Sequence, residues 1–159
     1  MLAVRNAIAQ LQAGAQELNL GGKLVGDAGA AVLATVLATN TTLRELKLNS
    51  NRIGPVGARS LAAALRNNAT LTSLDLSWNN IGAEGARSLA AALDNNATLT
   101  SLDLADNNIG AEGARSLAAV LDNNATLTSL SLKLNNMAMK ARGHSQWPWT
   151  TTRRSRAGC

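Results

Sequence analysis

Residues 71–98, LTSLDLSWNNIGAEGARSLAAALDNNAT, decide the fold of this chain, because the same 28-residue pattern stands before and after them. Residues 43–70 and 99–126 are copies of equal length, residues 15–42 are a weaker copy, and a fifth copy stops at Asn136. A pattern that recurs at constant spacing indicates a repeat architecture, in which each unit packs on its neighbours and is not stable alone.

Each unit joins a strand pattern to a helix pattern. In the L-x-L step, as at Leu74 and Leu76, apolar residues alternate with period two, which predicts a short strand with one buried face. An Asn turn follows, and then Ala58, Leu61 and Leu65 show the spacing of a helix that is buried on one side. The repeat therefore predicts alternating strands and helices.

The combination L-x-x-L-x-L-x-x-N and I-G-x-x-G-A-x-x-L-A-x-x-L resembles the ribonuclease-inhibitor-like class of leucine-rich repeats, also found in NOD-like receptors and some GTPase-activating proteins. The resemblance covers residues 15–136. It implies an α/β solenoid shaped like a horseshoe, with a short parallel sheet on the concave side and helices on the convex side. It also implies that one Asn per turn bonds backbone groups that the bend leaves free, a role that fits the need of buried backbone groups for partners. These turn residues are Asn51, Asn79, Asn107 and Asn135.

We expect three parts in the chain. Residues 1–14, with Val4, Ile8 and Leu11 on one helical face, form an N-terminal capping helix or the remnant of a preceding repeat. Residues 15–136 hold four repeats of 28 residues and a partial fifth. Residues 137–159 are an irregular basic tail without a single Leu.

The tail reads as a repeat in a shifted frame. When the third base of each codon is joined to the first two bases of the next, four dipeptides force the residue that the repeat requires: Met137-Ala138 gives Gly, Met139-Lys140 gives Glu, Trp147-Pro148 gives Ala and Trp149-Thr150 gives Asp. The other codons permit the rest of GDEGARSLAVALDNNATLTS. We infer loss of one base in an Ile codon after Asn136. The parent array is then longer, and this truncated chain has an uncapped apolar end prone to self-association.

The net charge of +5 comes entirely from this tail. Residues 1–136 contain ten Lys or Arg and ten Asp or Glu, so the repeats are neutral as a whole. We expect no specific nucleic-acid site; nonspecific phosphate binding by the tail is one alternative to the main interpretation.

The concave strand face is the predicted binding surface. Positions between the buried Leu residues place Asp75 and Asp103 in one row with Lys47, and Trp78 and Asp106 run beside this row. In the functional interpretation, Trp78 is an anchor and the carboxylates select a basic protein partner. In the alternative, this is a solvated polar face on which Trp78 covers its own sheet. A cation on the three Asp is disfavoured, since hard metals need about six oxygen ligands.

No catalytic, cofactor-binding or metal-ligating group is expected. His144 is the single His, Cys159 is the single Cys, and no catalytic triad or phosphate-binding loop can be assembled. Apolar runs are shorter than the roughly 18 residues of a membrane span, and no secretory signal is recognised, so an intracellular, cytoplasmic location is expected. Asn-x-Thr sequences at Asn40, Asn68, Asn96 and Asn124 fit turns better than glycosylation sites.

The sequence thus favours a non-enzymatic scaffold that binds a protein of unspecified identity on its concave strand face. A truncated gene fragment or a structural spacer with no ligand of its own is the alternative.

Overall fold

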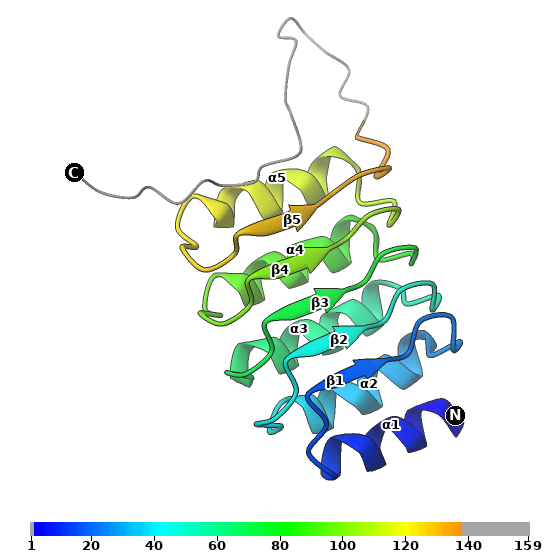
Figure 1. The fold of residues 1–159 in the computed structure, drawn as a ribbon. Helices are drawn as coiled ribbons and strands as arrows, with labels where there is room; N and C mark the ends of the chain where they lie inside the picture. The colour runs from blue at the N-terminus through cyan, green and yellow to red at the C-terminus, as the bar shows by residue number, and fades with distance from the viewer. Residues whose placement is uncertain (1, 138–159) are drawn as a thin grey trace, which may run out of the picture.

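The computed structural model describes residues 2–137, in which five helices alternate with five strands. The predicted basic tail therefore lies, except for Met137, outside the described residues. In chain order the elements are α1 (Leu2–Gln12), β1 (Glu17–Asn19), α2 (Gly26–Leu37), β2 (Glu45–Lys47), α3 (Pro55–Asn67), β3 (Ser73–Asp75), α4 (Gly82–Leu93), β4 (Ser101–Asp103), α5 (Gly110–Leu121) and β5 (Ser129–Ser131) (Figure 1).

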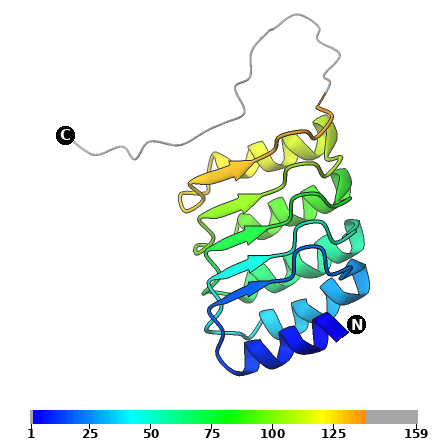
Figure 2. The same ribbon diagram turned by 45° about the vertical axis from the view of Figure 1, so that its right-hand side comes forward.

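The strands form one parallel sheet in sequence order, and the helices lie together on one of its faces (Figure 2). Every strand pairs with the next at an offset of one repeat, so Leu46 lies opposite Leu74, and Leu74 opposite Leu102. Equal repeat length places equal positions side by side. The α/β leucine-rich-repeat solenoid predicted from the sequence is thereby confirmed.

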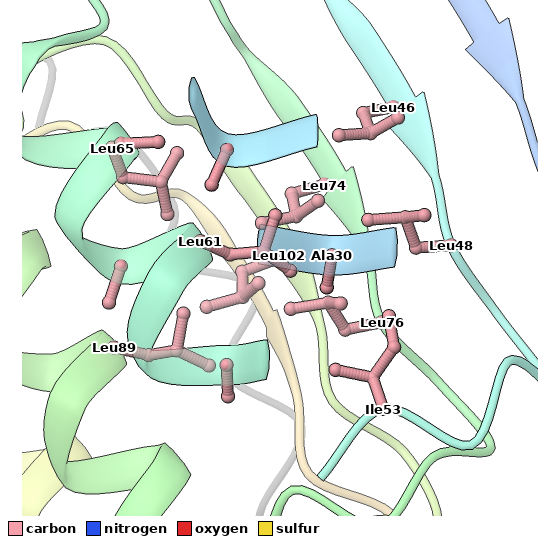
Figure 3. Close-up of a cluster of buried hydrophobic side chains, with 14 of the residues drawn as sticks. Ala30, Leu46, Leu48, Ile53, Leu61, Leu65, Leu74, Leu76, Leu89 and Leu102 are labelled. Carbon is pink, nitrogen blue, oxygen red and sulfur yellow. The ribbon is translucent and has the colours of Figure 1, made fainter. Parts of the chain in front are cut away.

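One continuous aliphatic core runs through the stack. Leu74 and Leu76 of the third repeat point from the sheet toward Leu61 and Leu65 of α3, and all four are at most 1% exposed (Figure 3). Burying a Leu side chain fully contributes about 1.5 to 3 kcal/mol. The core is therefore built from contacts between repeats as much as from contacts within them.

Neighbouring helices approach closely where α4 and α5 each carry a glycine. A Cβ added to Gly85 would lie 2.9 Å from Cβ of Ala58, and one added to Gly113 would lie 3.0 Å from Cβ of Ala86. Both distances are shorter than ordinary carbon contacts of about 3.5 to 4.0 Å. Small residues on the two facing helices thus set the spacing of the repeats.

The turn after each strand is held by an Asn side chain that reaches the preceding repeat. Asn79 Oδ1 accepts hydrogen bonds from the backbone N–H groups of Asn51 (3.0 Å) and Ile53 (2.9 Å), and its Nδ2 donates to the carbonyl of Leu48 (2.9 Å). Related bonds to the preceding repeat are made by Asn51, Asn107 and Asn135.

A second set of Asn side chains, Asn40, Asn68, Asn96 and Asn124, holds the turns after α2, α3, α4 and α5. Asn96 Nδ2 donates to the carbonyl of Leu65 (2.8 Å), near the C-terminal end of α3, while its Oδ1 accepts from the backbone N–H groups of Thr98 and Leu99. Carbonyls at a helix end lack partners within the helix, so this bond satisfies one of them. The Asn of the Asn-x-Thr sequence is thus engaged in the turn at both ends of its side chain.

The first helix covers the N-terminal side of the stack. Helix α1 buries Val4, Ala7 and Leu11, whereas Ile8 is only half-buried and Arg5 is exposed. Ile8, which the spacing placed on the same face as Val4 and Leu11, is a partly buried side chain packed against the core.

Candidate functional site

The strand face consists of the side chains on β1–β5 that point away from the helices. Parallel pairing arranges them in two rows, one on each side of the buried Leu of every strand. The first row is Asn19, Lys47, Asp75, Asp103 and Ser131. The second row is Glu17, Glu45, Ser73, Ser101 and Ser129.

The strand face is acidic. Glu17, Glu45, Asp75 and Asp103 provide four carboxylates, against the single ammonium group of Lys47. The sequence prediction named the two Asp and missed the two Glu. The signal was present, because Glu17 and Glu45 stand two residues before Asn19 and Lys47, and residues two apart in a strand share a face.

Lys47 is paired within this face. Its Nζ lies 2.8 Å from Glu45 Oε1. The hydrogen bond with Glu45 and the attraction of that carboxylate raise the pKa of Lys47 above its usual value of 10.5. The ammonium therefore stays charged and offsets Glu45, which leaves the excess negative charge on Glu17, Asp75 and Asp103.

The two Asp of the first row are fixed by their own backbone. Asp75 Oδ1 accepts from Ser77 N (2.9 Å) and Ser77 Oγ (2.7 Å), and Asp103 Oδ1 accepts from Ala105 N (2.8 Å). The Oδ2 atoms make no hydrogen bond within residues 2–137. Each carboxylate thus has one oxygen that orients it and one that is open to a partner.

Trp78 and Asp106 lie beyond the strands, in the loops that lead to α4 and α5. Their backbone N–H groups continue the ladder, since Trp78 donates to Ala105 (2.8 Å) and Asp106 to Lys133 (2.9 Å). Both have positive φ, 56° and 53°, a conformation uncommon for a bulky residue. Trp78 is 59% exposed, in the loop that follows β3.

An open hollow adjoins Trp78. Its walls include Asp27 of α2, Arg52 of the next loop and Pro55 at the start of α3, and its volume is about 740 Å³. Asp27 Oδ1 accepts from the backbone N–H groups of Gly54 (2.7 Å) and Gly57 (2.9 Å), so this carboxylate caps the N-terminus of α3. The sequence analysis did not find this hollow, since it joins three separate repeats.

The helix side of the stack carries charge pairs with a structural explanation. Arg87 bonds Glu84 on its own helix (2.9 Å) and also Glu112 on α5. Surface pairs of this kind contribute at most about 1 kcal/mol and need no ligand. Residues 2–137 contain no cluster of three His, Cys, Asp or Glu arranged to hold a metal ion. No helix in the same range has the length and apolar character of a membrane span.

A stack of identical strand–helix units with an open, charged sheet face defines a repeat protein of the solenoid type. The family description "Leucine Rich repeat" matches residues 39–62, 67–90 and 95–118, and the chain is a leucine-rich-repeat protein. The setting in NOD-like receptors stays a prediction.

Solved structures with a similar fold include the following two. One is described as "Leiomodin-1 Actin-Binding Site 2 (ABS2)": it has 26% sequence identity and a TM-score of 0.75, with 80% of this chain and 77% of that chain covered. The other is the tropomodulin C-terminal domain of Caenorhabditis elegans, with 15% identity and a TM-score of 0.72, and 82% of each chain is covered. No match was found among curated proteins. The repeats and the likeness to an actin-binding site support a protein-interaction scaffold.

Proposed function

We propose that this protein binds a partner protein on its strand face, through basic side chains of the partner. The observation that carries the proposal is a set of three carboxylates on the strand face, the in-register pair Asp75 and Asp103 of the first row and Glu17 of the second row. No cation within residues 2–137 neutralises them by an ion pair. Complementary charge steers association and selects among partners more than it adds affinity.

Trp78 supplies the apolar part of the proposed site. Trp78 is exposed and lines the hollow together with Asp27 and Arg52. Exposed Trp side chains often dominate the energy of an interface, because they bury a large area with little loss of conformational freedom. A basic segment with an apolar side chain near its Lys or Arg fits this arrangement.

Actin is a specific candidate partner. The reason is the likeness to the leiomodin-1 structure, which is described as an actin-binding site and covers 80% of this chain. Purified actin is therefore the first defined probe, in a co-sedimentation assay with the full chain. The competing hypothesis is a structural spacer or gene fragment without a ligand. It predicts that no protein binds to the strand face.

The test compares two double variants that remove equal charge. Asp75→Asn with Asp103→Asn keeps the oxygen that accepts from Ser77 and Ala105 and removes two charges from the strand face. Glu84→Gln with Glu112→Gln removes two charges from the helix side and is the matched control.

We expect the control double variant to bind its partner, either actin or a protein captured from cell extract, as the unmodified chain does. The affinity of the Asp double variant for the same partner should be at least about tenfold lower. Raising the salt concentration should weaken binding of the unmodified chain. Equal capture by both double variants contradicts the proposal, and absence of capture by the unmodified chain supports the spacer hypothesis.

A further inference from the structure

We propose that the C-terminal face of the stack, formed by α5 and β5, is a docking surface for one further repeat of the same kind, the one that the codons of residues 137–159 permit in the neighbouring frame. The first argument is the exposure of this face. Val120, Leu121 and Leu130 are half-buried, whereas their equivalents one repeat earlier, Ala92, Leu93 and Leu102, are at most 1% exposed.

The backbone ladder gives the second argument. In the inner repeats the N–H groups that follow each strand donate to the next repeat: Leu76 donates to Asp103 (2.9 Å) and Leu104 to Ser131 (2.9 Å). The equivalent N–H of Leu132 finds no acceptor within residues 2–137, although Leu132 is only 3% exposed. The N–H of Leu134, a residue that is 72% exposed, likewise finds no acceptor within this range. A buried donor without a partner is unfavourable, and an added strand in the same register satisfies it.

The end face also has the shape that a helix of this repeat requires. Ala86 of α4 packs closely against Gly113 of α5, as Ala58 of α3 packs against Gly85 of α4. On α5 the same position is Ala114, which lies on the open side of the stack and is 6% exposed, compared with 0% for Ala86. The next helix should therefore present a glycine three residues after its first helical glycine.

The shifted reading supplies that helix. With suitable silent bases it permits GDEGARSLAVALDNNATLTS after an Ile codon, and the EGA step of this reading places a glycine where α4 and α5 have Gly85 and Gly113. The codons force four residues of this reading: the first Gly, the Glu, the Ala before the second leucine of the helix, and the Asp after that leucine. The shifted reading is therefore compatible with the helix that the described end face fits.

The test replaces residues 137–159 with IGDEGARSLAVALDNNATLTS and compares this extended chain with the unmodified one. The matched control is the same extension with both of its helix leucines replaced by Ser. We expect the extension to raise the melting temperature by at least about 5 °C and the control to leave it near the unmodified value. Amide hydrogen exchange at Leu132 and Leu134 should slow in the extended chain only.

An extension that raises the melting temperature no more than its control, or leaves these two amides unprotected, overturns the proposal. Protection of both amides in the unmodified chain that grows with protein concentration also overturns it, in favour of a second copy on the end face. The nucleotide sequence across codons 130–160 tests the occupant separately, since silent bases that break the shifted reading exclude it.

Discussion

The backbone N–H of Asn51 donates to the side-chain oxygen of Asn79 at 3.0 Å, across the 28 positions of one repeat. Asn51 uses its own side chain in the same way on the repeat before, where its Oδ1 accepts from Val25 N at 3.1 Å. Each turn is therefore held by the repeat that follows it. This dependence explains why a single unit has no stability of its own.

Replacing Asn79 with Ala should destabilise the protein by about 2 to 4 kcal/mol, because several backbone groups of two repeats lose their partner at once. Urea denaturation followed by circular dichroism measures this change. Asn67→Ala is the matched control: Asn67 is an exposed residue of α3, and its replacement should change stability by less than about 0.5 kcal/mol. Equal effects would contradict the structural role of Asn79.

Gly85→Ala should destabilise the protein by about 1 to 3 kcal/mol, although Ala is the better helix former by about 1 kcal/mol. The added Cβ would lie 2.5 Å from Ile81 Cγ2 and 2.9 Å from Ala58 Cβ, so α4 must move away from α3. Thermal melting measures the effect. Ala91→Gly, at an exposed position of α4, is the control and should show the ordinary cost of a helical glycine. A stabilised Gly85→Ala variant would show that the helices are not in close contact.

Leu102→Ala should destabilise the protein by about 3 to 5 kcal/mol, and Leu130→Ala by markedly less. The two residues are neighbours in register, but Leu102 has a repeat on either side and is 1% exposed, whereas Leu130 is half-buried on the end strand. Denaturant midpoints of the two variants give the comparison. Equal losses would mean that Leu130 is covered in solution.

Trp78→Asn should leave stability unchanged or raise it slightly, since Asn tolerates a φ of 56° better than Trp does. The same variant should lose partner affinity by at least about tenfold if Trp78 is the anchor of the interface. Melting temperature and binding are measured on the same sample. Trp78→Ala, which lacks the ring and also lacks the tolerance of Asn for positive φ, separates the two effects.

Lys47→Gln should strengthen the binding of a basic partner by a factor of a few, because it frees Glu45 and makes the strand face more negative. The gain should shrink as salt is raised from low to physiological concentration. Titration calorimetry at two ionic strengths checks both points. Weaker binding by Lys47→Gln would show that the partner presents acidic groups to this face.

The sequence by itself determined the repeat length, the strand and helix of each unit, the buried leucines and the row that joins Lys47, Asp75 and Asp103. It could do so because identical units of constant length must stack with equal positions in register, whatever the details of their side chains. Only the tertiary structure decided that Glu45 neutralises Lys47, that Trp78 stands at a hollow formed with Asp27, and that Arg87 reaches Glu112 on the next helix. The hollow and the Arg87–Glu112 pair join different repeats, whereas Lys47 and Glu45 stand on one strand. All three contacts depend on side-chain rotamers or loop conformations, which the spacing of residues along the chain does not encode.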